Sequence, residues 1–400
     1  MTRTDQQPRR AAADQAAASV ERGPMPWLEG ARIGAQGSTS ERLKSVDALR
    51  GFDMFLIIGG VDIIRALDIP LQSPVTAAIN VQLDHAEWVG FHFWDIVMPL
   101  FLLLVGVSIP FAFAKRLGDG ASKASQWPHI IKRFVLLWIL GMVVQGNLLT
   151  YDPDEFIVFD NTLQAIAVGY LIAVVLALYL PVRVQMLATA ALAGVYWWVM
   201  ETLPVPGFGV GDYSPEGNAA FFIDQLVLGP WQEQDSSYTW VLSGLTFGVT
   251  VMLGVFAGYL LRMNVKQTRK LVALTLTGFA LVAAGLLWGL VHPIIKQIWT
   301  GSFALFSAGL CYLLLAFFYL VIDVWKLTRW ARWLIIIGAN SIFAYVAWHT
   351  FDFKLIGDLF AAGLEPFTGD WYPFVRYTIA FGVLFVILWV MYRKRFFIKV

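Results

Sequence analysis

The sequence predicts an all-α fold, a polytopic membrane helix bundle with about ten transmembrane helices. Hydrophobic residues make up 58% of the 400 residues and charged residues only 14%, whereas soluble domains contain about 25% charged residues. The apolar residues gather in runs long enough to cross a bilayer core of about 30 Å. Lys and Arg lie almost entirely in every second connection between these runs, which is typical of a polytopic membrane protein.

Ten apolar runs qualify as spans, because a helix needs roughly 20 apolar residues to cross the bilayer. In chain order they cover residues 49–67, 88–114, 134–150, 161–180, 184–203, 239–262, 271–293, 301–323, 333–349 and 374–392. The first, third and ninth runs are short, and the first contains Gly59-Gly60. Short or interrupted spans are expected where a helix tilts or breaks beside a cavity.

The distribution of basic residues predicts the orientation of these spans. With the amino terminus in the cytoplasm, 25 of the 29 Lys and Arg residues fall in cytoplasmic segments; the exceptions are Arg65, Lys296, Lys354 and Arg376. An added or missing span would destroy this alternation. We therefore predict that both termini are cytoplasmic and that the protein is a multi-pass protein of the plasma (inner) membrane.

Two regions follow from composition. Residues 1–40 are rich in Ala, Gln, Arg and Gly without an apolar stretch, which predicts a disordered cytoplasmic tail. Residues 41–400 form the transmembrane domain. The net charge of +1 gives no indication of a nucleic-acid partner, and membrane lipid is the partner that the composition requires.

Ionisable residues are costly inside a membrane and usually mark a functional site. In the first span Arg50 and Asp53 are three residues apart, so they share a helix face and form either a structural ion pair or a site in which Arg50 binds a ligand. Four further residues lie at the external start of the second span: His85, Glu87, His92 and Asp95.

Histidines and carboxylates at such spacing suit general acid–base chemistry. His92 and Asp95 are three apart, so we expect them on one helix face, with the carboxylate orienting the imidazole. Metal binding is the competing use of these side chains, but their spacing matches no zinc signature, and we predict no metal. Gly254 and Gly258 have the spacing of a close helix crossing.

Several motifs resemble the heparan-α-glucosaminide N-acetyltransferase family. They include Arg42-Leu-Lys-Ser-Val-Asp-Ala-Leu-Arg50-Gly-Phe-Asp-Met54, His85-Ala-Glu-Trp88, Asp95-Ile-Val-Met-Pro-Leu-Phe101, Leu163-Gln164 and Gly338-Ala-Asn-Ser-Ile342. They occur in order over roughly residues 42–350. The resemblance implies a transmembrane acyltransferase that moves an acetyl group from cytoplasmic acetyl-CoA to an amino sugar or glycan terminus outside.

The resemblance also implies roles for individual residues. His85 matches the catalytic histidine of the family's His-Ala-Ser-Trp motif, and Asp95 supports it. The histidine acts either as the general base or as a carrier that is itself acetylated. Arg50, Asn340 and Ser341 are expected to bind the donor, acetyl-CoA. The residues around His85 are expected to bind the acceptor; they are Glu87, Trp88 and His92.

Two predictions stay open beside this one. The alternative function is a transporter or flippase for a sugar or lipid-linked sugar on the same scaffold. A homodimer is the assembly we consider possible.

The topology can be tested with single cysteines introduced into a Cys311→Ser background, because Cys311 is the only cysteine. An impermeant maleimide applied to intact cells should label cysteines in residues 68–84 and 204–238 and leave one at the carboxyl terminus unlabelled. Labelling at the carboxyl terminus, or protection of both loops, would contradict the predicted orientation.

Overall fold

The computed structural model describes residues 43–118, 122–152, 155–233 and 237–398. The predicted tail, residues 1–40, lies outside this range. The α-helices are α3 (Lys44–Phe55), α4 (Val61–Ala66), α5 (Asp68–Leu71), α6 (Pro74–Leu83), α7 (Val97–Gly118), α8 (Trp127–Val144), α9 (Thr162–Tyr179), α10 (Val182–Thr202), α11 (Ala219–Leu228), α12 (Ser243–Arg262), α13 (Gln267–Trp288), α14 (Gly301–Phe318), α15 (Arg332–Ala339), α16 (Ser341–Thr350), α17 (Phe353–Ala361), α18 (Glu365–Thr368) and α19 (Tyr372–Arg393). A π-helix, η1 (Leu56–Gly60), joins α3 to α4, and a second, η7 (Tyr319–Val324), follows α14.

The chain is a polytopic membrane helix bundle. Within the described residues, seven helical segments are long and apolar enough to cross a membrane, and the pair α15–α16, bent by 75°, raises the number to as many as eight. The two other predicted spans are also helical: residues 49–67 fall on α3, η1 and α4, and residues 184–203 on α10.

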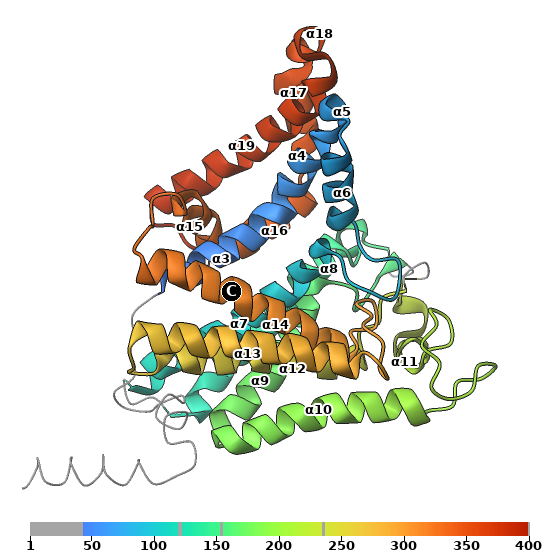
Figure 1. The fold of residues 1–400 in the computed structure, drawn as a ribbon. Helices are drawn as coiled ribbons and strands as arrows, with labels where there is room; N and C mark the ends of the chain where they lie inside the picture. Colours follow the sequence, from blue (N-terminus) through green and yellow to red (C-terminus); the bar gives the residue numbers. More distant parts are fainter. Residues whose placement is uncertain (1–42, 119–121, 153–154, 234–236, 399–400) are drawn as a thin grey trace, which may run out of the picture.

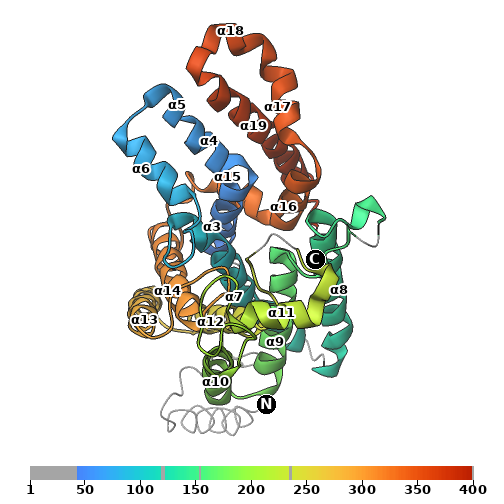
Figure 2. The ribbon, with the colours of Figure 1, turned by 90° about the vertical axis from the view of Figure 1, so that its right-hand side faces the viewer.

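Two helices form the centre of the bundle and others its periphery. In α12 and in the segment Phe93–Ala114, 89% and 83% of the most apolar stretch is buried, against 17% in α13 and in the segment of α17–α19. α12 packs against α7 and α9, while α13 covers α14 from outside. Figures 1 and 2 show α4–α6 and α17–α19 extending away from the other helices.

Glycines let the two central helices touch backbone to backbone. A Cβ on Gly106 of α7 would lie 2.0 Å from the carbonyl oxygen of Val251, and one on Gly254 of α12 would lie 2.1 Å from that of Leu103. Gly258 has Val107 as its backbone neighbour in the same way. The close packing predicted from the Gly254–Gly258 spacing is therefore confirmed, and α7 is its partner.

The first span breaks where the sequence predicted. Inside η1, Ile58 and Gly59 leave the helical region, and Gly59 has a φ of +111°, which favours glycine because it has no Cβ. The side chain of Trp348 on α16 lies beside this break.

The second span begins later than predicted. Residues 84–92 are not helical, and the helix starts with a 3₁₀ turn, η2 (Phe93–Ile96). The reason is that this segment bonds to another part of the chain: Gly90 N–H donates to the Ile294 carbonyl at 2.9 Å, and the Gln297 amide donates to the carbonyls of Ala86 and Glu87. The expectation that His92 and Asp95 share a helix face is therefore wrong, because His92 precedes the helix.

The connections gather at two ends of the bundle. One end holds residues 84–92, α11, and residues 289–300 between α13 and α14 (Figure 1). The other holds the start of α3, the α12–α13 connection and the end of α19.

The contact of α7 with α12 predicts a strong effect of small substitutions. Gly106→Ala and Gly254→Ala should each lower the Tm of the purified protein, because overpacking costs typically about 1–3 kcal/mol and backbone atoms cannot move aside singly. Gly194→Ala is the matched control, since nothing lies within 4 Å of its added Cβ. Thermal denaturation in detergent measures the effect, and equal Tm values for all three variants would contradict it.

Candidate functional site

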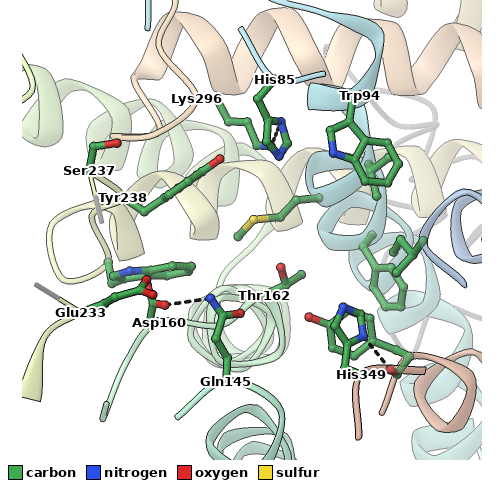
Figure 3. A pocket seen from close by; sticks show the side chains of 16 residues that line it. His85, Trp94, Gln145, Asp160, Thr162, Glu233, Ser237, Tyr238, Lys296 and His349 are labelled. Carbon is green, nitrogen blue, oxygen red and sulfur yellow. Dashed lines mark hydrogen bonds between the residues drawn. The ribbon is translucent and has the colours of Figure 1, made fainter. Parts of the chain in front are cut away.

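A cavity of about 470 Å³ lies near the end of the bundle that carries residues 84–92 and 289–300. Its titratable side chains are His85, Asp160, Glu233, Tyr238, Lys296, Tyr345 and His349. Figure 3 shows His85, Lys296 and Trp94 on one side of the cavity and Asp160, Glu233 and Gln145 on the other. Ile57, Val97, Met98 and Phe101 add apolar lining. Its volume is in the range of small-molecule sites, and its polar groups converge from separate segments.

His85 is held by the buried carboxylate of Asp95. The imidazole Nδ1 lies 2.7 Å from Asp95 Oδ1, and Asp95 Oδ2 accepts the backbone N–H groups of Ala86 at 3.2 Å and His92 at 2.9 Å. Because a carboxylate only accepts, Nδ1 carries the hydrogen, and Nε2 keeps its lone pair. The side chain of His85 is 42% exposed, whereas that of Asp95 is 1% exposed. The arrangement is a partly accessible base on a fixed support.

Lys296 completes this cluster from a distant part of the chain. Its Nζ lies 2.9 Å from Nδ1 and 3.3 Å from Nε2 of His85, and 3.3 Å from Asp95 Oδ1. Burial lowers the pKa of Lys296 to about 8, although Asp95 acts in the opposite direction. In the sequence, Lys296 stands out only as one of four basic residues outside the predicted cytoplasmic segments, and this rarity was the available signal for a role.

A hydrogen-bond chain fixes the loop that carries Lys296. The Gly301 N–H donates to His292 Nε2 at 3.0 Å, so the hydrogen of this neutral imidazole is on Nδ1, which donates to the Tyr213 hydroxyl at 2.7 Å. Tyr213 in turn donates to Glu201 Oε1 at 2.8 Å. Burial lowers the pKa of His292 to about 3, which keeps the ring neutral. This series of hydrogen bonds is a structural support for the loop.

Asp160 forms the polar group on the other side of the cavity. Gln145 donates to Asp160 Oδ2 at 2.9 Å, and Asn161 donates to Gln145 Oε1 and to the Tyr345 hydroxyl. These bonds join the ends of α8 and α9 to α16, as expected for uncharged polar groups in a membrane bundle. Burial and a hydrogen bond with Glu233 raise the pKa of Asp160 to about 8, so Asp160 keeps its proton near neutral pH.

The residues predicted to bind the acceptor lie on the same segment as His85, but with other contacts. Glu87 is exposed, Trp88 Nε1 donates to the Tyr213 carbonyl at 2.7 Å, and His92 Nδ1 donates to the Asp84 carbonyl at 3.2 Å. In the described part of the chain the cavity lining includes Trp94 but none of these three.

Arg50 does not pair with Asp53. It donates to Ser108 Oγ of α7 at 2.9 Å and lies 4.0 Å from Asp47 Oδ1. Helical side chains lean toward the amino terminus, so Arg50 lies toward Asp47 and away from Asp53. Among the residues that the structure describes, the fully buried carboxylate of Asp53 has no hydrogen-bond partner.

Asn340 and Ser341 lie at the bend between α15 and α16. Asn340 donates to the Phe396 carbonyl at 3.1 Å and accepts the Ile398 N–H at 3.0 Å, which binds the segment after α19 to this bend. Ser341 is buried at the first position of α16. Neither residue is among the described residues that line the cavity, so a contact with the reacting group next to His85 has to come from elsewhere.

A membrane helix bundle with a histidine–carboxylate pair in a polar cavity defines the class: a polytopic membrane protein equipped for acid–base chemistry. Residues 42–286 match the family model described as heparan-alpha-glucosaminide N-acetyltransferase, catalytic. The chain belongs to this family, and the resemblance found in the sequence motifs is confirmed.

Two curated relatives carry the name heparan-alpha-glucosaminide N-acetyltransferase. The human protein is 24% identical over an alignment 419 residues long. The match covers 90% of this chain and 60% of the human protein. The mouse protein is 23% identical over 429 residues, which cover 91% of this chain and 61% of its own length. The chain thus spans about three fifths of the length of these relatives.

Proposed function

We propose that the protein transfers an acetyl group from cytoplasmic acetyl-CoA to an amino sugar or glycan terminus on the external side of the plasma (inner) membrane. The observation that carries this proposal is the contact of His85 with Asp95 at the cavity, because the motif around His85 resembles the one that carries the family's catalytic histidine. Family membership supports the reaction class.

The Nε2 atom of His85, which faces Lys296 at 3.3 Å, suits the base of this reaction. As the acceptor nitrogen attacks the thioester carbonyl carbon, Nε2 takes the proton of the amine, and Asp95 stabilises the imidazolium through Nδ1. When the tetrahedral intermediate collapses, the C–S bond breaks and the leaving thiolate takes the proton back from His85. The products are an N-acetylated acceptor and CoA.

A second route uses the same atom. Nε2 attacks the thioester itself, CoA leaves, and the acetyl group passes from the imidazole to the acceptor. Labelled acetyl-CoA without acceptor distinguishes the two routes, since only the second leaves label on His85.

Donor and acceptor approach from opposite ends in this proposal. Acetyl-CoA is too highly charged to cross the membrane, so its nucleotide stays on the cytoplasmic side, where we assign its phosphates to Arg50 with Asn340 and Ser341 nearby. The acceptor enters from the end that carries residues 84–92, where Glu87, Trp88 and His92 are the proposed contacts. Membrane lipid surrounds the bundle, and a homodimer stays a prediction.

Replacing the base is the main test. In His85→Gln the rate of acetyl transfer should fall about a hundred- to ten-thousand-fold, as expected for loss of a general base, while a thermal shift with acetyl-CoA shows that the variant folds and binds donor. His129→Gln is the matched control, because His129 is an exposed histidine at the start of α8. Near-normal transfer by a folded His85→Gln protein would contradict this mechanism and favour the transporter or flippase.

The donor assignment gives a separate prediction. Arg50→Ala should weaken acetyl-CoA binding by about 1.5–3 kcal/mol, the usual contribution of a charge-assisted hydrogen bond, and leave acceptor KM unchanged. Ser108→Ala is the control, since it removes the partner of Arg50 but keeps the charge. Equal acetyl-CoA affinity in Arg50→Ala and the parent protein, measured by calorimetry, would exclude Arg50 from the donor site.

A further inference from the structure

Lys296 contacts the imidazole of His85, and a lysine with only a structural role would not need this contact in addition to Asp95. A buried ammonium group is stabilised by one carboxylate, and Asp95 supplies that at 3.3 Å. The same Nζ also lies within 3.3 Å of both imidazole nitrogens of His85. This second contact brings two groups that can each carry a positive charge against one another, which costs free energy if both are protonated.

The contact has a chemical consequence for His85. Asp95 balances the single positive charge of Lys296. The proposed base needs the neutral imidazole of His85, whose Nε2 lone pair accepts the proton.

Lys296 also has donors left for a substrate. An ammonium group has three N–H donors, and one is sufficient for Asp95. The side chain lines the cavity, and its Nζ is 3.3 Å from Nε2, the atom at which the acceptor would lose its proton. A thioester carbonyl attacked there has its oxygen within reach of Nζ. Among the described lining residues Lys296 is the one lysine or arginine.

We propose that Lys296 is a further catalytic residue, whose ammonium group binds the thioester carbonyl oxygen and stabilises the negative charge that forms on it. This inference rests on the proposed acetyltransferase function. Asn340 and Ser341, by contrast, are not among the described residues that line the cavity. Preorganised donors of this kind are most effective in sites shielded from water.

The charges balance in each step. When the acceptor nitrogen bonds to the carbonyl carbon, the carbonyl π electrons move to oxygen beside the Lys296 ammonium, and the amine proton moves to His85 Nε2. The intermediate then carries two positive charges, on Lys296 and His85, and two negative charges, on Asp95 and the oxyanion. When the carbonyl re-forms, the thiolate leaves with the proton from His85, and Lys296 keeps its own protons throughout.

The proposal predicts how the rate depends on pH. The charged and titratable groups facing Lys296 are His85, Asp95 and Tyr238, whose ring centre is 5.8 Å from Nζ, with Asp160 and Glu233 lining the same cavity. Since the pKa of Lys296 is about 8, transfer should decline as the pH rises through about 8 and the ammonium group is lost. The need for a deprotonated His85 has the opposite effect, because it makes the transfer rate rise with pH.

The experiment compares Lys296→Met, Lys296→Arg and a control, Lys354→Met, in the purified full chain. Lys354 is another external lysine, 3.2 Å from Asp62 and 44% exposed. Lys296→Met should lower kcat by about a hundred- to a thousandfold, the usual effect of removing one oxyanion donor, with little change in acetyl-CoA KM. Lys296→Arg should keep part of the activity and move the alkaline decline to higher pH, because a guanidinium group stays charged.

A second readout does not depend on acetyl transfer. Diethyl pyrocarbonate modifies neutral imidazole, so its reaction with His85 between pH 5 and 8, followed by peptide mass spectrometry, reports the protonation of that side chain. In Lys296→Met the midpoint should move to higher pH, and in Lys354→Met it should not.

The outcomes separate the two proposals. Unchanged kcat and an unchanged alkaline decline in Lys296→Met overturn the role of Lys296 and leave the acetyltransferase function intact. Unfolding of both Lys296 variants, or an unchanged midpoint for His85 modification, also overturns that role and makes the lysine structural. Absence of acetyl transfer in the parent protein overturns the proposed function, while the His85 midpoint still tests whether Lys296 controls the charge of His85.

Discussion

The buried carboxylate of Asp95 is the interaction on which the site depends. It lies at the start of the helix that continues into α7, and it binds His85, two backbone N–H groups of residues 84–92 and the Lys296 ammonium group. Two non-helical segments, residues 84–92 and 289–300, are thereby joined through one side chain. Backbone N–H and C=O groups outside a helix need hydrogen-bond partners within the protein when they lie beside the membrane. The hydrogen bonds between residues 84–92 and 289–300 supply such partners, which also explains why the second span begins at Phe93.

The helix bundle gives this cluster a rigid base. α7 follows directly from the turn that holds Asp95, and glycines bring its backbone into contact with α12 at the centre of the bundle. The loop that carries Lys296 is fixed separately through His292, Tyr213 and Glu201. The positions of base, carboxylate and ammonium group are therefore set by packed helices and a buried hydrogen-bond chain, and a functional site gains precision from such support.

The cavity has two polar groups of different character. The His85 side combines an imidazole, a carboxylate and an ammonium group, whereas the Asp160 side combines the carboxyl groups of Asp160 and Glu233 with the neutral amide of Gln145. The proposed acetyl transfer needs the first group at the reacting atoms. Aromatic side chains such as Trp94, Tyr238 and Trp240 line the space between.

The sequence by itself determined the membrane helix class, most of the membrane-spanning helices, the break at Gly59, the close packing at Gly254 and the family. It also selected His85 and Asp95, through the motifs that resemble the family. Tertiary structure alone decided that His92 precedes the helix and shares no face of it with Asp95, that Arg50 binds Ser108 and not Asp53, and that Lys296 reaches His85 across 211 residues of sequence. The physical reason is that hydropathy and helix periodicity encode which segments enter the membrane, whereas contacts between loops depend on how the helices pack and on which backbone groups remain to be satisfied.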